Sequence, residues 1–461
     1  MSRIIFVIIS TQLFFSQDLF SGYTLFSPLT HGPLGGGENY TRLIDNNGNI
    51  VNQWDHEYPG AMAPYLMPDS TLICPFQVED PFMLGSAYGG KLIRYNWNGD
   101  ILWEYDYSDT NHLQHHDIEP LENGNILIVA WDRKTYLEVV AAGRQNVEGE
   151  MWPDMVVELE PIGVDSANVV WEWKFWDHLI QDVDSNFENF GVVEEHPELI
   201  DINIGQMVML PMGIADWNHI NSIDYNQDLD QIILSSRNMS EIYIIDHSTT
   251  TEEAAGHTGG NSGMGGGFLY RWGNPMNYGR GNAEDQVLVG QHDANWIELG
   301  YPGEGNIIIF NNGALSGFGG GFLSSIVEIV PPVDNQGHYE IVDVNAYGPS
   351  TPVWTHSSDY FSHIMSGVRR LPNGNTFISV ATELRMIEVD TNGDVIWEYI
   401  HNEPGQPNIS KAFKYSLDYL EIETGILGDI NNDYNVDLLD IVLIVNFIFR
   451  GILCPLCKIP A

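Results

Sequence analysis

Between residues 23 and 420 the chain alternates short apolar runs with clusters of Gly, Asn and Asp. Within the runs, apolar and polar positions alternate every second residue, which is the pattern of a β-strand with one buried face. In the clearest copies, two runs flank an Asn-Gly or similar turn, and the second run ends in Trp. These copies are residues 43–54, 92–103 and 386–397. We expect each to be a β-hairpin with a tight, primed turn.

The hairpin pattern recurs along the chain, which indicates a repeat architecture. Weaker copies bring the number to six; they cover residues 156–171, 268–272 and 326–354. A second hairpin signature, clearest at residues 121–128 and 371–378, has looser equivalents at 66–72, 223–234 and 297–309. Two hairpins per unit make a four-stranded blade, which buries both faces only when it stacks on neighbours. The pattern therefore predicts an all-β fold, a six-bladed β-propeller over residues 23–420, with a β-sandwich or a solenoid as alternatives.

The first twenty residues have the character of an export signal. A basic residue, Arg3, precedes an apolar run over residues 4–15 that is too short to span a bilayer. We interpret residues 1–20 as a signal peptide; a membrane-anchored first helix and a buried strand are the alternatives. The mature chain is then expected to be secreted, periplasmic or extracellular, without a membrane span. In an oxidising compartment Cys454 and Cys457 are close enough to pair, while Cys74 is expected to be a buried thiol.

The last part of the chain, residues 425–461, carries a ladder of oxygen-bearing side chains followed by an apolar stretch. The ladder has the spacing of a twelve-residue calcium loop and consists of Asp429, Asn431, Asp433, Asn435, Asp437 and Asp440. Ca²⁺ prefers six or more oxygen ligands at such a spacing. The segment resembles one repeat of a type I dockerin, an EF-hand-like unit, which implies Ca²⁺ binding and a cohesin-like partner. Two departures are Tyr434 in place of a turn glycine and the presence of one repeat rather than two.

The charge balance excludes some functions. The chain has 18 Lys and Arg against 63 Asp and Glu, a net charge of −45. Such a field repels phosphate backbones and anionic membrane surfaces, so nucleic-acid binding is not expected. The glycine clusters at 259–267 and 319–321 lack the Lys-Ser/Thr ending of a phosphate-binding loop, so no nucleotide is expected either.

Three histidines occupy similar positions in successive units. Eight residues before the turn of the second hairpin signature lies His116 in one unit, Met62 in another and Ser366 in a third. The corresponding stretches of two further units contain His219 and His292. Corresponding positions of propeller blades lie around the central axis. We therefore expect the three imidazoles to converge near one mouth of the channel.

The residues beside these histidines suggest anion chemistry. Asp117 and Asp293 directly follow two of them, and their charges are expected to raise imidazole basicity. Arg237 is one of few bases in an acidic chain, and a guanidinium without a carboxylate partner suits the oxygens of a sulfate or phosphate group. An Arg paired with one of the many carboxylates is the alternative.

Four short motifs, taken together and in order, resemble the bacterial arylsulfotransferase family. They are His-His-Asp-Ile-Glu-Pro-Leu-Glu-Asn-Gly-Asn at 115–125, Asn-His-Ile-Asn-Ser at 218–222, Ser-Ser-Arg at 235–237 and Gln-His-Asp-Ala at 291–294. The resemblance implies a six-bladed propeller that moves a sulfuryl group from an aryl sulfate donor to a phenolic acceptor. It implies no nucleotide sulfate donor and no catalytic cofactor.

The resemblance also implies roles for four residues. His292 would be the nucleophile that carries a transient sulfohistidine, and Arg237 would hold the sulfuryl oxygens. His116 and His219 would stabilise the oxyanion and exchange a proton with the phenols. Two other functions stay open at this stage: a His-ligated metallohydrolase, and a noncatalytic extracellular propeller that binds glycans or proteins.

Overall fold

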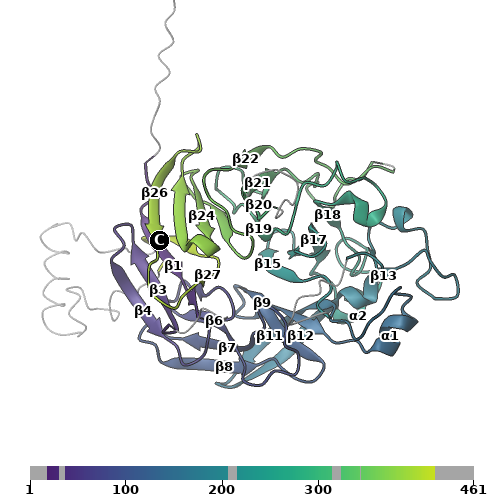
Figure 1. Ribbon diagram of the computed structural model, residues 1–461, viewed down its shortest axis with the longest axis horizontal. Helices are drawn as coiled ribbons and strands as arrows, with labels where there is room; N and C mark the ends of the chain where they lie inside the picture. Colours follow the sequence, from purple (N-terminus) through teal and green to yellow (C-terminus); the bar gives the residue numbers. More distant parts are fainter. Residues whose placement is uncertain (1–17, 31–36, 206–214, 314–322, 343, 421–461) are drawn as a thin grey trace, which may run out of the picture.

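The computed structural model describes residues 18–30, 37–205, 215–313, 323–342 and 344–420. The expected signal peptide, the calcium ladder of the tail and the pair Cys454 and Cys457 lie outside these residues, so those expectations stay predictions. Six antiparallel sheets of four strands each stand in a ring (Figure 1). The predicted all-β, six-bladed propeller is confirmed.

Each blade runs from a strand near the axis to a strand at the rim, and its strands follow one another in the chain except in blade one. Blade one consists of β28 (Phe413–Ser416), β1 (Gly22–Phe26), β3 (Tyr40–Asp45) and β4 (Ile50–Asp55). Blade two consists of β5 (Tyr65–Leu66), β6 (Leu72–Gln77), β7 (Gly90–Tyr95) and β8 (Ile101–Asp106). Blade three consists of β9 (His112–Pro120), β10 (Ile126–Asp132), β11 (Asp154–Ile162) and β12 (Ser166–Lys174).

The second half of the ring repeats the order. Blade four consists of β15 (Ile220–Asn226), β16 (Gln231–Ser236), β17 (Glu241–Asp246) and β18 (Tyr270–Trp272). Blade five consists of β19 (His292–Trp296), β20 (Ile307–Asn311), β21 (Ser325–Ile329) and β22 (Trp354–His356). Blade six consists of β23 (Gly367–Arg370), β24 (Thr376–Val380), β25 (Arg385–Val389) and β26 (Val395–Ile400).

The remaining elements are short and lie between the blade strands. Strand β2 (Pro28–Leu29) pairs with β27 (Asn408–Ile409), and β13 (Leu179–Ile180) runs parallel to β14 (Ile200–Asp201). The α-helices are α1 (Tyr136–Ala141) and α2 (Thr251–Ala254), and the 3₁₀ turns are η1 (Phe175–His178), η2 (Val193–Glu195), η3 (Pro275–Tyr278) and η4 (Ala381–Glu383). No helix in the described ranges is long and apolar enough to cross a membrane.

Blade one is completed from both ends of the propeller chain. Its innermost strand, β28, pairs antiparallel with β1, and Gly22 lies opposite Ser416. A strand from the end of the repeat region thus closes the ring beside a strand from its beginning. The repeat pattern alone did not predict this exchange, because β28 carries neither hairpin signature.

The outer hairpin turns differ from the predicted primed type. In β3–β4, Gly48 donates its N–H to Asp45 O and adopts φ +80°, while the two residues between them keep negative φ. Gly99 and Gly393 adopt φ +88° at the same place in their hairpins, and the strand pairing slips by one residue beside each turn. These turns need a positive φ only at the glycine, with a bulge beside it, instead of at two consecutive residues.

The repeated Trp of the outer strands joins neighbouring blades. The indole N–H of Trp54 in blade one donates to Asn96 O in blade two at 2.9 Å, and that of Trp103 in blade two donates to Ser166 O in blade three at 2.8 Å. Trp397 of blade six donates to Asn46 O of blade one at 2.8 Å, across the closure. The repeat is therefore explained by ring assembly: each tryptophan fills an interface and satisfies a carbonyl of the next blade. The predicted buried thiol, Cys74, is 3% exposed in the same core.

Candidate active site

The innermost strands of blades three, four and five bend where the three candidate histidines lie. His116 and His219 adopt left-handed φ of 53° and 54°, and Asp293, next to His292, adopts 52°. Each inner strand slips out of register with its neighbour at this point. A bulge of this kind re-aims a side chain relative to the regular pleat. The inner strands β9, β15 and β19 face the middle of the ring in Figure 1.

The four candidate residues come together at this place. The rings of His116 and His219 meet at a centroid distance of 4.5 Å. Arg237 follows β16, and its backbone N–H donates to His219 O at 3.1 Å. The charges of His292 and Arg237 act on His116, and that of Arg237 also acts on His292. The structure thus groups side chains from three blades that lie up to 176 positions apart in the sequence, from His116 to His292 (292 − 116).

A hydrogen-bonded relay fixes the proton of His116. Asp154 Oδ1 lies 2.8 Å from His115 Nε2, so the neutral form of His115 carries its proton on Nε2 and accepts at Nδ1. His116 Nδ1 lies 2.7 Å from that acceptor and must donate to it. His115 is also stacked on Trp131 at a centroid distance of 4.2 Å. His116 therefore carries its lone pair on Nε2.

An acid orients His219 in the same sense. Asp216 Oδ2 accepts from His219 Nδ1, and Asp216 Oδ1 accepts from the Trp131 indole at 3.2 Å. Burial raises the pKa of Asp216, but the charge and hydrogen bond of His219 outweigh it and hold that pKa below its usual value. The carboxylate stays ionised, and a neutral His219 keeps its proton on Nδ1 and its lone pair on Nε2.

An amide orients His292. Asn312 Nδ2 donates to Ser362 O at 2.9 Å and to Met365 O at 3.1 Å, so its Oδ1 is left to accept from His292 Nδ1 at 2.7 Å. The proton of His292 is thereby held on Nδ1 and the lone pair lies on Nε2. The backbone N–H of Met365 donates to this Nε2 at 3.1 Å. Attack by Nε2 on a substrate requires that weak contact to be exchanged for the substrate.

Burial makes the central imidazoles poor proton acceptors. It lowers the pKa of His292 to about 3, and the positive field of Arg237 adds to the effect. Burial, followed by the charges of neighbouring His219 and His115, lowers the pKa of His116 well below its usual value. Both rings are neutral at neutral pH, so the Nε2 atom of each ring carries no proton.

The expectation that Asp117 and Asp293 raise the basicity of their neighbouring histidines is wrong. The bulge at each place changes the direction of neighbouring side chains, and these carboxylates pair with cations of other strands instead of the imidazoles. Asp117 lies 2.6 Å from Lys411 Nζ, and Asp293 lies 2.7 Å from Arg369 Nη1. The acids that touch the histidine cluster are instead Asp154 and Asp216.

Arg237 is a half-buried cation beside the three histidines. Within the residues that the structure describes, its guanidinium forms no ion pair, and its side chain reaches only Asn238 Oδ1 at 3.5 Å. Burial lowers its pKa, partly opposed by the charge of Asp216, from a value so high that the group stays charged. Its hydrogen-bond donors are thus available to a ligand oxyanion.

The arrangement does not resemble a metal centre. Across the described ranges, no three His, Cys, Asp or Glu side chains are grouped in a way that could hold a metal ion. The only cation of the cluster, Arg237, would also repel a divalent ion at this point. The geometry suits an anion that contacts one guanidinium and several imidazole nitrogens.

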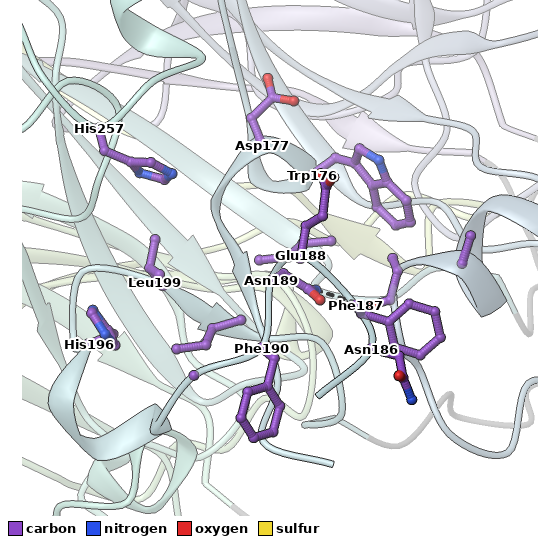
Figure 2. Close-up of a pocket in the computed structure, with 15 residues that line it drawn as sticks. Trp176, Asp177, Asn186, Phe187, Glu188, Asn189, Phe190, His196, Leu199 and His257 are labelled. Carbon is purple, nitrogen blue, oxygen red and sulfur yellow. Dashed lines mark hydrogen bonds between the residues drawn. The ribbon is translucent and has the colours of Figure 1, made fainter. Parts of the chain in front are cut away.

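A separate cavity of about 700 Å³ lies in the insertion between blades three and four. Figure 2 shows Trp176 and Asp177 on one side of it, Phe187 and Phe190 on another, and His257 beyond. None of the four candidate residues lines this cavity. Its size does not make it the reaction site, because the convergent imidazoles and the free guanidinium lie elsewhere.

Sequence reasoning missed Asn312, Asp154 and Lys411. Asn312 directly follows β20, the second strand of blade five, as Arg237 directly follows β16, the second strand of blade four. A comparison of these two positions in the sequence could have identified Asn312. Asp154 opens β11, and nothing in its neighbourhood of the sequence connects it to His115, 39 positions away. Lys411 could not be placed without the closure of the ring by β28.

One family model and several solved structures are similar to this chain. The family model described as Arylsulfotransferase (ASST) matches residues 34–388 of this chain. No curated protein matches the chain. Among solved structures, a protein of unknown function from Bacteroides caccae is 10% identical with a TM-score of 0.45, over 86% of this chain and 99% of that one. A periplasmic gluconolactonase from Pseudomonas aeruginosa is 12% identical with a TM-score of 0.42, over 86% and 99%.

Proposed function

Because the chain belongs to the arylsulfotransferase family, we propose that it moves a sulfuryl group from an aryl sulfate to a phenol through a sulfohistidine at His292. The single observation that carries this proposal is the state of His292. Its Nδ1 proton is held by Asn312 and burial lowers its pKa to about 3, so Nε2 is unprotonated at neutral pH and can attack once substrate replaces the Met365 N–H.

In the first half-reaction, His292 Nε2 forms a bond to sulfur while the bond from sulfur to the aryl oxygen breaks. The electron pair of that bond leaves with the phenolate. The proton stays on Nδ1 of the ring, hydrogen-bonded to Asn312 Oδ1, so the sulfated ring is an imidazolium and a good leaving group for the next step. Asn312 thereby stabilises the positive charge that develops on the ring.

The sulfuryl oxygens carry negative charge throughout the transfer. Arg237 is assigned to them, because it is charged, half-buried and near His292, and its planar fork matches two oxygens. Interactions of this type contribute most where the site excludes water and the donors are already in position.

In the second half-reaction, an acceptor phenol attacks sulfur and the bond from sulfur to His292 Nε2 breaks. The phenolic proton passes to Nε2 of His219, whose Nδ1 is hydrogen-bonded to the Asp216 carboxylate, and the ring of His116 lies beside it. A donor with an acidic phenol leaves as its phenolate and needs no proton from the protein.

The test is sulfuryl exchange between two phenols. The protein is mixed with 4-nitrophenyl sulfate and a second phenol, without nucleotide donor, after treatment with a chelator. Release of nitrophenol that depends on the acceptor, with a sulfated acceptor as product, supports the proposal. Loss of activity on chelation would favour the metallohydrolase, and no transfer at all would favour a binding propeller.

We also infer that the chain is exported and that its tail binds Ca²⁺. The support is the sequence of residues 1–20 and the oxygen ladder from Asp429 to Asp440. Calorimetric titration of the full chain with Ca²⁺, compared with an Asp429→Asn variant, tests the ladder. Equal heats in both proteins would reject it, and a cohesin-like partner would then lose its basis.

A further inference from the structure

Next to the histidines in the chain, a buried ion network joins the inner strands of several blades. Lys411 lies just before β28 and is 4% exposed. Its Nζ lies 2.6 Å from Asp117 Oδ2 and 3.4 Å from Asp293 Oδ1, which are 1% and 3% exposed. One ammonium from blade one thus contacts carboxylates from blades three and five. These carboxylates belong to the residues that directly follow His116 and His292.

The same carboxylates also hold neighbouring inner strands. Asp117 accepts from Ile223 N at 3.2 Å and from the Tyr65 hydroxyl at 2.9 Å, so it joins blades two, three and four. Asp293 accepts from Val368 N at 2.8 Å and from Arg369 at 2.7 Å, so it joins blades five and six. Asp117 accepts hydrogen bonds on both oxygens, whereas Asp293 accepts both of its bonds on Oδ2. Asp293 Oδ1 has only the ion-pair contact with Lys411, which is therefore shared between the two acids.

This network contacts the strand bulges that orient the side chains of His116 and His292. His116 and Asp293 are in the left-handed conformation, which a residue with a Cβ adopts only when its surroundings hold it there. At both bulges the residue adjoining a candidate histidine is anchored to Lys411. The ammonium is the shared contact between the strand of His116 and the strand of His292.

We propose that Lys411 is a positioning residue for sulfuryl transfer: it ties Asp117 and Asp293 together across the channel and so fixes the distance between His116 and the nucleophile His292. The inference rests on the proposed function of that cluster. Lys411 acts through the two strands and does not touch the reacting groups.

The fold offers a matched control. Lys414, three residues further on, forms an equally buried ion pair with Glu388 and lies over the Trp397 ring, on the blade one to blade six side. Replacing Lys414 leaves the buried carboxylate of Glu388 without its ammonium, just as replacing Lys411 does to Asp117. Glu388, however, contacts none of the strands that carry the histidines. Both losses should lower the melting temperature.

The experiment compares Lys411→Met, Lys414→Met and the double variant Lys411→Met/Asp117→Asn. The measurements are the melting temperature and the kcat and KM of sulfuryl transfer from 4-nitrophenyl sulfate. We expect Lys411→Met to lower kcat about tenfold to a hundredfold with little change in KM, and Lys414→Met to keep kcat despite its lower melting temperature. The double variant should regain melting temperature, because the unpaired carboxylate is gone, without regaining kcat.

Equal kcat in the two single variants, or recovery of kcat together with stability in the double variant, would overturn the proposal. If Lys411→Met does not fold, the double variant alone decides between the two outcomes. An independent measurement uses side-chain NMR of ¹⁵N-histidine protein, where the Nδ1 proton signals of His116 and His292 should shift on loss of Lys411 and stay on loss of Lys414. A wild-type protein without transferase activity would reject the proposed function, whereas unmoved NMR signals would reject the role of Lys411.

Discussion

The imidazole rings of His116 and His219 meet edge to face with their centroids 4.5 Å apart, although they belong to different blades. Each ring has its Nδ1 proton committed to a partner, His115 in one case and Asp216 in the other. Two Nε2 lone pairs are thereby placed beside each other and near Arg237. His219, backed by the Asp216 carboxylate, is placed to accept a proton from a phenol while the guanidinium holds the sulfuryl oxygens.

The pH dependence of the first half-reaction follows from the low pKa of His292. An ordinary histidine nucleophile loses its lone pair to protonation near pH 6.5, whereas His292 is protonated only near pH 3. We expect the rate constant for release of nitrophenol in a rapid-mixing experiment to stay constant from pH 8 down to about pH 4. A decline centred near pH 6.5 would show that the nucleophile has an ordinary pKa.

The free energy of unfolding should change over the same interval. The unfolded chain binds the His292 proton near pH 6.5 and the folded protein only near pH 3, so acid favours unfolding by up to about 2 kcal/mol at pH 5. A folded His292→Gln variant should therefore lose less stability between pH 7 and pH 5 than the wild type. Equal losses in urea titrations would contradict the assigned pKa.

Arg237 should act mainly on the rate. We expect Arg237→Gln to lower kcat by about a hundredfold to a thousandfold, because a donor that stabilises developing charge is lost. Arg237→Lys should recover part of the rate, since an ammonium restores the charge but not the planar fork. Arg94→Gln is the control: it changes the net charge equally, but Arg94 pairs with Asp69 away from the histidines. A similar loss in both variants would mean that only the overall charge matters.

Asn312 should control the tautomer of the nucleophile. In Asn312→Leu, His292 loses the acceptor for its Nδ1 proton, and we expect kcat to fall about tenfold to a hundredfold. Asn375→Leu is a matched control, because Asn375 is also buried and its amide donates to Glu388 Oε1 in blade six, outside the contacts of the three imidazoles. A fall in kcat of equal size in both variants would assign the effect to loss of stability.

The fold and the grouping of the three histidines could be predicted from the sequence because both depend on repetition. Strand alternation, turn glycines and terminal tryptophans recur with each blade, and residues at equal places in the repeat must face the same axis. His116, His219 and His292 were found on that basis alone. The turn type was wrong because Asn-Gly also fits a turn with one positive φ followed by a bulge.

The contacts that tune the site were not accessible from the sequence. Asp117 and Asp293 stand next to histidines in the chain, yet they pair with Lys411 and Arg369 of other strands. Asp154 and Asn312 do touch the imidazoles, but they come from other strands at separations of 39 and 20 residues. Such pairs depend on how two strands lie side by side, and a repeat pattern does not contain that information.

The tryptophan contacts between blades predict a stability effect without a catalytic one. Trp54→Phe removes the hydrogen bond to Asn96 O and part of a buried ring, and we expect the free energy of unfolding to fall by about 1–3 kcal/mol. Denaturant titration measures the change, and kcat should stay within about twofold of the wild type. A loss of kcat at unchanged stability would contradict a purely structural role for the repeat.

The most direct test of the account is the covalent intermediate. Wild-type protein is quenched within one turnover after mixing with 4-nitrophenyl sulfate in the absence of acceptor, and is then digested and analysed by mass spectrometry. His356→Ala serves as the control, because His356 is buried in the same blade on its outermost strand. We expect one sulfuryl group on His292 in wild type and in His356→Ala, and none in His292→Ala. A sulfated intermediate on another residue, or one that persists in His292→Ala, would contradict it.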